Sequence, residues 1–469
     1  MTAEAVSPSP SSTLDAAREV ESLRRVFNSR LTRSREWRER QLDAVIRFCK
    51  EEERAIAEAL EQDLGKPPLD SFASEIVFVI NEAKHAKKHL AEWMATERVA
   101  TPLTLQPARS EVHWEPLGVA LVISPWNYPF QLAVAPLVAA LAAGCCVLIK
   151  PSEVAPHTSR LLAERLTKYV DGGAVRIIEG GVPETTAILA EPFDHIFYTG
   201  NGRVARIIMA AAAKHLTPVT LELGGKSPCI VDASADLDLA ARRIVWGKYF
   251  NAGQTCVAPD YVLAEESIHD ALLSRIVSTL REFYGDDPQA SPDYARIISE
   301  RHHDRLVGLL EGATLVVGGE HQRSDRYLAP TVVRDVDRRH PVMGEEIFGP
   351  ILPFLSVANI DDALRFVQQG DKPLALYLFS GERSVQERVL AETSSGGAAI
   401  NHVMAHLAVP DLPFGGVGPS GMGAYHGRWG FETFSHRKAV LRASTVVDSA
   451  QLLYPPTNAI KDAIARKVL

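Results

Sequence analysis

The chain of 469 residues is long enough for two or three domains of ordinary size. Hydrophobic residues make up 46% and charged residues 23%, which is typical of a globular protein and excludes a disordered chain, a collagen-like repeat and a disulfide-rich mini-protein. The formal net charge of −8 gives no general attraction to nucleic acid or to an anionic membrane, so we expect no nucleic-acid partner. Five cysteines, none in a CxxC pair, favour a reducing compartment, and we expect a cytoplasmic protein.

The N-terminal part of the chain reads as a tail followed by helices. Residues 1–13 have neither the basic start nor the apolar core of a signal peptide, and we interpret them as a flexible tail. From Leu14 to Leu64 apolar residues recur at helical spacing, which predicts charged amphipathic helix. Gly65-Lys66-Pro67-Pro68 ends it, and a second helix is expected to about Thr96.

A stretch without any charged residue runs from Gly118 to Ile149, which is long enough for a membrane span. Prolines at positions 125, 129 and 136 interrupt it. The stretch is better interpreted as a buried strand over 119–124, an Ala-rich helix over about 133–143 and a second buried strand over 145–149. We therefore predict no transmembrane segment.

Short apolar strands alternate with helices through the rest of the chain. The predicted strands are 119–124, 145–149, 174–178, 194–198, 218–223, 228–231, 261–264, 314–317, 351–355 and 376–379, with helices that include 156–169 and 204–215. This alternation predicts an open, mostly parallel α/β sheet in the first half and a similar arrangement in the second. A Gly-rich loop over 414–423 lies near a domain boundary.

Two strand ends have residues suited to a dinucleotide. Gly200, Gly202 and Ala205 fit G-x-G-x-x-A between a predicted strand and helix, where glycines permit close approach of the backbone to a pyrophosphate. A plain strand–helix turn explains the same pattern. Lys150 and Glu153 follow another strand, where open α/β sheets bind ligands, and they can bond ribose hydroxyls. A solvated turn is the alternative there.

A cysteine, a glutamate and an asparagine are candidates for covalent catalysis. Cys256 follows Gly253-Gln254-Thr255, so its surroundings are not simply apolar. Glu222 ends an apolar strand, where desolvation raises a carboxyl pKa toward the range of a general base. Asn127 lies on a loop between two prolines, and a fixed amide can donate to an oxyanion. An inert buried cysteine and a structural turn are the competing interpretations, and spacing alone leaves the pairing of Cys256 with Glu222 open.

Five segments, in this order, resemble the aldehyde dehydrogenase superfamily, and the resemblance extends from about residue 15 to 445. Within it, residues 256–261 and 413–418 are similar to the class 3 group. The five segments are Pro125-Trp126-Asn127-Tyr128-Pro129, Lys150-Pro151-Ser152-Glu153, Leu221-Glu222-Leu223-Gly224-Gly225-Lys226, Gly253-Gln254-Thr255-Cys256 and Glu345-Glu346-Ile347-Phe348-Gly349-Pro350.

The resemblance implies oxidation of aldehydes to carboxylic acids. Cys256 would attack the aldehyde carbon, and the Asn127 amide with the Cys256 backbone N–H would hold the oxyanion. Hydride transfer would leave a thioester, and Glu222 would activate the water that hydrolyses it. The class 3 likeness suggests medium or long aliphatic, aromatic or other apolar aldehydes, with Phe72, Trp246 and Phe250 as candidate pocket walls; core aromatics are the alternative.

The implied cofactor is NAD, with NADP also accepted. The resemblance places Lys150 and Glu153 at the adenosine ribose, Gly200 and Asn201 at the pyrophosphate, and Glu346 and Phe348 on the nicotinamide side; Trp126, Leu223 and Gly224 complete the expected cofactor site. We expect no metal site, and we interpret the pair His302-His303 as surface residues on a charged helix.

The implied fold is α/β, with a Rossmann-type cofactor domain, an α/β catalytic domain and a small β oligomerisation element, and a homodimer is expected. The expected divisions are 1–110 with 127–222 for the cofactor domain, 223–420 for the catalytic domain, 111–126 with 421–447 for the oligomerisation element, and 448–469 for a tail without an apolar anchor.

Two other activities would use the same cysteine. A cofactor-free thiol esterase could employ Cys256 and Glu222, although it would not need the cofactor residues. A CoA-acylating dehydrogenase would also need the cysteine, although a retained Glu222 favours hydrolysis of the thioester over its transfer. A structural protein that keeps only the fold is disfavoured, since all three catalytic positions hold competent side chains.

Overall fold

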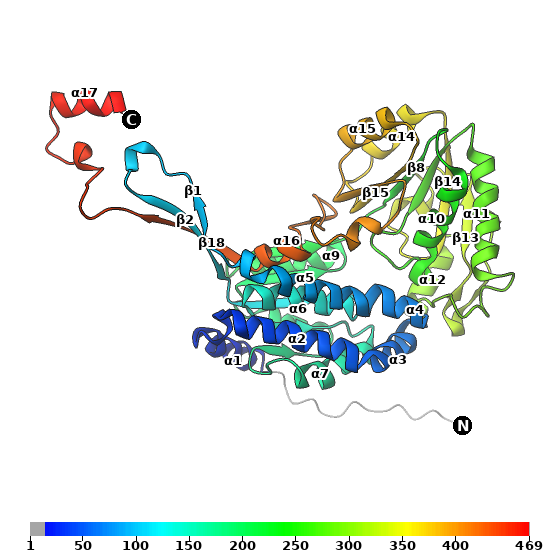
Figure 1. Cartoon of the computed structure of the whole chain (residues 1–469). Coiled ribbons are helices and arrows are strands. Elements are labelled where there is room, and N and C mark those ends of the chain that lie inside the picture. Colours follow the sequence, from blue (N-terminus) through cyan, green and yellow to red (C-terminus); the bar gives the residue numbers. More distant parts are fainter. Residues whose placement is uncertain (1–14, 469) are drawn as a thin grey trace.

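The computed structural model describes residues 15–468. It has two α/β lobes, one built around each large sheet, and an arm that projects from the first lobe (Figure 1). The predicted N-terminal tail, residues 1–13, lies outside the described residues.

The first lobe is built on a six-stranded sheet in the order β17-β7-β6-β3-β4-β5. Five strands are parallel and β17 is antiparallel to β7. The interior strands are fully buried, as expected for a parallel sheet covered on both faces. The strands are β3 (Val119–Ile123), β4 (Cys146–Lys150), β5 (Val175–Ile177), β6 (His195–Thr199), β7 (Val219–Glu222) and β17 (Gly421–Met422). The prediction of a mostly parallel sheet in the first half is confirmed.

Helices cover this sheet, and one of them explains the uncharged stretch. Helix α6 (Gln131–Ala143) has every side chain buried and packs against α2 and α5, so the stretch is strand, helix and strand as predicted. None of the helices in the described part of the chain is long and apolar enough to cross a membrane. The other helices of this lobe are α1 (Ala16–Asn28), α2 (Arg35–Glu51), α3 (Glu53–Leu64), α4 (Pro68–Ser71), α5 (Val77–Trp93), α7 (Pro156–Arg165), α8 (Val182–Leu189) and α9 (Gly202–Ala213).

The predicted helical region is more broken over residues 15–64 than its periodicity suggests. Arg30 has a φ of +67°, which ends the run of helix after α1, and Ser34 then caps α2 by accepting a bond from the Trp37 amide. The periodic pattern continues across this break because all three helices bury one apolar face. A short π-helix (Phe72–Ile76) precedes α5.

The second lobe is built on a seven-stranded sheet in the order β10-β13-β14-β9-β8-β15-β16, in which β10 alone is antiparallel. Two of its strands, β13 and β16, escaped prediction; β16 is rich in Gly and Ala, which have low β propensity. The strands are β8 (Pro228–Val231), β9 (Tyr261–Glu265), β10 (Thr314–Val317), β13 (Thr331–Arg334), β14 (Ile351–Val357), β15 (Ala375–Phe379) and β16 (Gly397–Ile400); the helices are α10 (Leu237–Tyr249), α11 (His269–Tyr284), α12 (Glu300–Gly308), α13 (Pro341–Gly344), α14 (Ile360–Gln368) and α15 (Arg383–Glu392), and β11 (His321–Gln322) with β12 (Tyr327–Leu328) forms a small hairpin.

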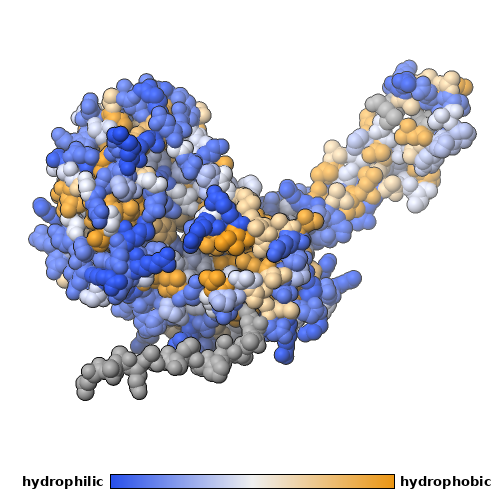
Figure 2. Space-filling model, turned by 180° about the vertical axis from the view of Figure 1, so that it is seen from behind, coloured by the Kyte–Doolittle hydropathy of each residue, from blue (hydrophilic) through white to orange (hydrophobic). Residues whose placement is uncertain are grey.

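The arm is an antiparallel sheet of β1 (Glu97–Val99), β2 (Arg109–Pro116) and β18 (Ser435–Arg442), and helix α17 (Ala459–Val468) lies at its outer end (Figure 1). Hydrophobic side chains are exposed along it (Figure 2); Leu103 is 90% and Val446 is 91% exposed. A three-stranded sheet on its own buries little apolar surface. It is therefore not expected to be stable with water on both of its faces.

The arm corrects the expected domain boundaries. Residues 119–123 were assigned to the oligomerisation element, but they form β3 at the centre of the six-stranded sheet. Residues 421–422 pair with β7, and α16 (Gly427–Thr433) packs on α5 and α6, so this part of 421–447 also belongs to the first lobe. Conversely, β1 lies in the arm although 97–99 were assigned to the cofactor domain. A continuous apolar pattern does not reveal which sheet a strand joins.

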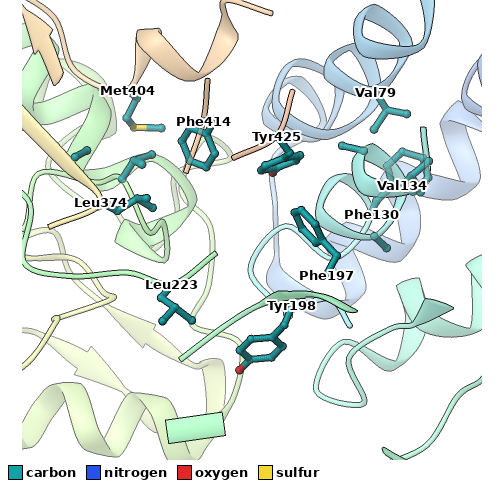
Figure 3. Close-up of a cluster of buried hydrophobic side chains, with 14 of the residues drawn as sticks. Val79, Phe130, Val134, Phe197, Tyr198, Leu223, Leu374, Met404, Phe414 and Tyr425 are labelled. Atoms are coloured by element: carbon teal, nitrogen blue, oxygen red, sulfur yellow. The ribbon is translucent and has the colours of Figure 1, made fainter. Parts of the chain in front are cut away.

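A hydrophobic cluster connects the two lobes (Figure 3). Phe197 of β6 packs against Tyr425 with ring centroids 4.9 Å apart, and Tyr425 packs against Phe414 at 5.8 Å. Leu223, just beyond β7, lies on the same side as Leu374 of the second lobe in this view. The carboxyl ends of β6 and β7 therefore meet the second lobe at a packed junction.

Candidate active site

The segment that carries Cys256 is a tight turn after α10. Asn251 and Ala252 both have a φ of +52°, and Gly253 follows with a φ of +73°. A Cβ atom on Gly253 would lie 2.3 Å from the Gly349 carbonyl oxygen, so only glycine fits there. Cys256 is the one cysteine that is partly exposed, while the other four are buried and all five are free.

Asn127 lies against this turn. Its Nδ2 donates to the Gln254 carbonyl oxygen at 3.0 Å, and its own carbonyl oxygen accepts from Asn251 Nδ2 at 2.9 Å. Asn127 is 3% exposed. The loop that carries Asn127 is thus hydrogen-bonded to two residues, Asn251 and Gln254, of the turn that leads to Cys256.

Glu222 ends strand β7, where it is buried and unusually isolated. Neither of its carboxyl oxygens has a hydrogen-bond partner among the described residues. Burial therefore raises the pKa of this carboxyl well above its ordinary value, since nothing offsets the loss of solvation. An unpaired buried carboxyl is costly to keep, which marks it as a functional candidate.

The thiol of Cys256 is affected by burial and by two acidic residues. Burial, and then the charges of Glu346 and Glu222, raise its pKa to about 12. Burial, and then the charges of Glu222 and Cys256, also raise the pKa of the Tyr425 hydroxyl well above its ordinary value. These four residues therefore belong to one electrostatically coupled region.

A cavity of about 360 Å³ lies between the two lobes, and four residues of the predicted cofactor site line it: Asn201, Leu223, Gly224 and Glu346. A Cβ atom on Gly224 would lie 2.2 Å from a Glu346 carboxyl oxygen, so glycine permits this approach. Burial raises the pKa of Glu346 to about 8, and its Oε1 has no partner among the described residues. An unsatisfied carboxyl oxygen at the wall of a cavity is suited to accept from a sugar hydroxyl.

The start of α9 has the form expected for a phosphate-binding turn. The Gly200 amide donates to the Glu222 carbonyl oxygen at 2.9 Å, and a Cβ on Gly200 would lie 2.2 Å from the Tyr198 hydroxyl oxygen. Asn201 caps the helix by accepting from the Val204 amide at 3.0 Å. The helix N-terminus opens toward the cavity that Asn201 lines, which fits a dinucleotide phosphate.

Lys150 and Glu153 lie just beyond strand β4, outside the lining of this cavity. Lys150 Nζ donates to Glu153 Oε2 at 2.6 Å and to the Pro151 carbonyl oxygen at 2.9 Å. Lys150 is buried, whereas the Glu153 side chain is 49% exposed. The pair is available at the carboxyl edge of the sheet, where the ribose of a dinucleotide would lie.

Trp126 and Phe348 lie together, with ring centroids 5.3 Å apart. The structure corrects one interpretation here: of the pair His302-His303, His303 does not lie on the surface. His302 is half-buried and packs against Trp126 at 4.9 Å, and His303 is 1% exposed with Nε2 3.1 Å from the Tyr327 carbonyl oxygen. The charged neighbours of these histidines, Arg301 and Asp304, are exposed, which concealed the buried position of His303. Within residues 15–468, no group of three or more His, Cys, Asp or Glu residues is arranged to hold a metal ion.

The three aromatic residues predicted to line the substrate pocket lie in two separate parts of the structure. Trp246 and Phe250 pack together at the end of α10, 5.7 Å between centroids, just before the Cys256 turn. Trp246 is 40% exposed, which suits a pocket wall better than a core position. Phe72 is also 40% exposed and lies on the π-helix, with no aromatic contact to the other two among the described residues.

Two residues that build the site, Lys226 and Asp260, were not predicted to have a role there. Lys226 donates to Asp260 and to the carbonyl oxygens of Val342 and Glu345 at 2.9 and 2.8 Å, while Asp260 accepts from the Ile347 amide at 2.9 Å. Together they fasten the loop that carries Glu346. Both residues lie in segments quoted for the resemblance, but only the folded chain shows what they hold.

Comparisons with known proteins show which family the chain belongs to. The sequence pattern of the aldehyde dehydrogenase family matches residues 6–440. The chain is 50% identical over 441 residues to rat "aldehyde dehydrogenase, dimeric NADP-preferring" (Rattus norvegicus), covering 94% of this chain and 97% of the relative. It is 48% identical over 450 residues to mouse "aldehyde dehydrogenase family 3 member A2" (Mus musculus), covering 96% and 93%. A solved structure described as the substrate-bound state of Staphylococcus aureus AldH has a TM-score of 0.94 at 43% identity, covering 97% of this chain and all of that one. The chain belongs to the aldehyde dehydrogenase family, and it oxidises aldehydes to carboxylic acids with NAD(P).

Proposed function

We propose that Cys256 is the nucleophile of this oxidation and that Glu222 is the base that releases the product. The observation that carries the proposal is the fully buried Glu222, unpartnered and close enough to raise the pKa of the Cys256 thiol. No structural task accounts for a carboxyl in that position, whereas a base with a raised pKa suits proton transfer near neutral pH.

The chemistry follows from the order of these groups. The Cys256 sulfur bonds to the aldehyde carbon as its proton leaves for a carboxylate, and the carbonyl oxygen becomes an oxyanion. The second N–H of the Asn127 amide and the Cys256 backbone N–H are the donors for that oxyanion. NAD(P), when bound, supplies the acceptor for the hydride that leaves the carbon. Glu222 then takes a proton from water, whose oxygen attacks the thioester carbon; the carbon–sulfur bond breaks, the acid leaves and the thiol is restored.

We assign the cofactor residues the roles that the family resemblance implies. Glu346 would accept from a ribose hydroxyl on the nicotinamide side, and Phe348 with Trp126 would form an apolar wall there. Gly200 and Asn201, at the start of α9, would bind the pyrophosphate, with Leu223 and Gly224 between this helix and Glu346, and Lys150 with Glu153 would bind the adenosine ribose. The shared cavity supports the assignments of Asn201, Leu223, Gly224 and Glu346, and the close Gly224–Glu346 approach supports the last two.

The substrate class we propose is apolar aldehydes, either aromatic or medium to long aliphatic. Half-exposed Trp246 and Phe250 beside the Cys256 turn supply apolar contact area, and Phe72 is assigned to the same pocket on the resemblance alone. The test is the initial rate of cofactor reduction with benzaldehyde, nonanal and propanal, each with and without CoA. A kcat/KM that rises with chain length and does not change with CoA supports the proposal. A rate that requires CoA would instead identify an acylating enzyme.

We propose that NAD is the preferred cofactor and that NADP is also accepted. Glu153 would lie beside a 2′-phosphate, where two like charges repel, while its ion pair with Lys150 offsets part of that repulsion. The rat relative is named NADP-preferring, so its name points the other way. Glu153→Gln removes the charge and keeps a hydrogen-bonding group, and we expect the ratio of kcat/KM for NADP to that for NAD to rise about fivefold or more, the equivalent of about 1 kcal/mol.

This experiment needs a control that removes another glutamate charge and leaves the ion pair intact. Glu164→Gln, on helix α7 and away from β4, should leave the cofactor ratio unchanged. A wild-type enzyme that favours NADP, or a ratio that Glu153→Gln does not move, would mean that Glu153 does not face the ribose.

We infer that the protein is a homodimer joined through the arm, that the first lobe binds the cofactor and that the second lobe contributes Cys256. The exposed apolar side chains and the unpaired strand edges of β1 and β18 support the arm as the interface, and the rat relative is named dimeric. Sedimentation should give twice the chain mass, and Leu441→Glu on β18 should shift it toward the single chain. A mass unaffected by that change would place the interface elsewhere.

We also propose a cytoplasmic location, because five free cysteines suit a reducing compartment.

A further inference from the structure

A buried ion pair lies beneath the Asn127 loop, and the proposed chemistry does not use it. Lys66 follows α3 and Glu75 lies on the π-helix, and both side chains are fully buried. Lys66 Nζ donates to Glu75 Oε1. Burial lowers the pKa of the Lys66 ammonium, and the charge of Glu75 partly restores it.

Glu75 holds the chain directly after the Asn127 loop. Its Oε2 accepts from the backbone amides of Phe130 and Gln131, each at 3.0 Å. These are the first amides of helix α6, which have no partners within the helix. A carboxylate at a helix N-terminus is also favoured by the helix dipole. Glu75 therefore fixes the point at which the loop becomes α6.

Lys66 holds the loop itself. Its Nζ lies 3.4 Å from the Asn127 carbonyl oxygen and 4.1 Å from the centre of the Tyr128 ring. The three N–H donors of an ammonium are thus directed at a carboxylate, a carbonyl and an aromatic face. The Tyr128 hydroxyl in turn lies 2.7 Å from Thr255 Oγ1, the residue before Cys256.

The contacts run from the ion pair to two segments, the Asn127 loop and the turn that leads to Cys256. One branch reaches the backbone of Asn127, and the other reaches Thr255 through Tyr128. Buried ion pairs generally add little stability over apolar residues of the same size, so stability alone is a poor reason to keep one here. An oxyanion donor, however, has to be held within about 0.5 Å of its working position.

We propose that Lys66 and Glu75 are positioning residues, which hold the Asn127 amide in register with Cys256 for the oxyanion of the covalent adduct. The inference rests on the proposed function, because it assigns the pair a task only if Asn127 is an oxyanion donor. The pair acts through the loop and touches neither substrate nor cofactor.

The main test replaces both members together, so that no unpaired charge is left behind. In the double variant Lys66→Met/Glu75→Gln, the glutamine oxygen can still accept from the α6 amides, while the ion pair and the donor to Asn127 are removed. We expect the single-turnover rate of cofactor reduction to fall about tenfold or more, with the dissociation constant of NAD unchanged within about twofold. The loss should appear in kcat rather than in KM for the aldehyde.

A matched control separates positioning from general loss of stability. Arg38 is another buried cation of the same helix bundle, and its Nη1 donates to the Ala142 carbonyl oxygen at 3.0 Å, at the opposite end of α6. Arg38→Met should lower the melting temperature at least as much as the double variant and leave the single-turnover rate within about twofold of the wild type.

A double-mutant cycle with Asn127→Ala shows whether the ion pair affects the rate through Asn127. If the pair acts through Asn127, the double variant should slow the Asn127→Ala enzyme by less than about twofold, because the group it positions is gone. An equal loss in both backgrounds, or no loss in the wild-type background, overturns the inference. If the double variant does not fold, the isosteric Glu75→Gln alone is put through the same cycle with the same criteria.

The cycle also separates a failure of the positioning role from a failure of the proposed role of Asn127 as oxyanion donor. A wild-type enzyme that slows with Asn127→Ala and not with the pair variants contradicts only the positioning role. A wild-type enzyme whose rate does not respond to Asn127→Ala contradicts the oxyanion assignment itself.

Discussion

Cys256→Ala is expected to reduce the rate of aldehyde oxidation by about 10⁴-fold or more, since the sulfur forms the bond through which the reaction proceeds. The dissociation constant of NAD should stay within about twofold of the wild type, because the residues assigned to the cofactor do not include the thiol. The measurements are cofactor reduction at 340 nm and titration of NAD binding by fluorescence.

One of the four buried cysteines supplies the control. Cys49 lies on α2 within the core of the first lobe, and burial raises the pKa of its thiol to about 12, as in Cys256. Cys49→Ala makes the same chemical change at a site with no carboxyl partner, and it should leave the rate near that of the wild type. Substantial turnover by Cys256→Ala, or equal losses in the two variants, would remove Cys256 from the mechanism.

The sequence predicted the sheet of the first lobe because its strands are continuous apolar runs. Val119–Ile123 and Cys146–Lys150 are buried on both faces, and their shortness and β-branched residues distinguish them from the equally apolar helix α6. The fold class followed from that alternation and is confirmed by the fit to a relative of known structure. The strand Gly397–Ile400 was missed because small residues leave no such run.

The predicted catalytic residues came from short motifs, and their proximity came from the fold. Asn127 and Gln254 are far apart in the chain, yet the Asn127 amide bonds the Gln254 carbonyl oxygen. No local pattern contains that contact. Lys66 and Glu75 were not predicted at all, since a lysine after a glycine and a glutamate in a helix are ordinary surface features until the fold buries both.

The raised pKa of the Cys256 thiol adds a condition that motifs do not contain. Burial, and then the charges of Glu346 and Glu222, raise that pKa to about 12, so the thiol keeps its proton near neutral pH. Reaction therefore requires a proton acceptor, and Glu222 is suited to that step as well as to the activation of water. Which of the two steps needs Glu222 more is a question that its substitution answers.

Glu222→Gln keeps the shape of the side chain and removes its capacity to accept a proton. If Glu222 serves mainly to activate water, the variant should produce a burst of reduced cofactor of up to about one equivalent per site, followed by turnover about 10²-fold or more below the wild type as the thioester accumulates. Rapid mixing followed at 340 nm measures both phases, and mass spectrometry of the quenched protein should detect the acyl group on Cys256.

The pH dependence of the slow phase gives a second readout with a definite sign. The base has to be ionised, and burial raises its pKa, so wild-type deacylation should fall as the pH falls through that raised value. Glu222→Gln should lose this acidic limb, because it has no proton to gain.

Glu82→Gln is the matched control for this change. Glu82 is a buried carboxyl on α5 whose pKa burial raises to about 7, and it accepts from the Gly427 amide at 3.0 Å. The same isosteric change there should leave burst and turnover near the wild type, since Glu82 has a backbone partner and no assigned role in the chemistry. If Glu222→Gln also abolishes the burst, Glu222 is required to deprotonate Cys256. If it leaves steady turnover unchanged, another group activates the water, and the assignment of Glu222 as the base is wrong.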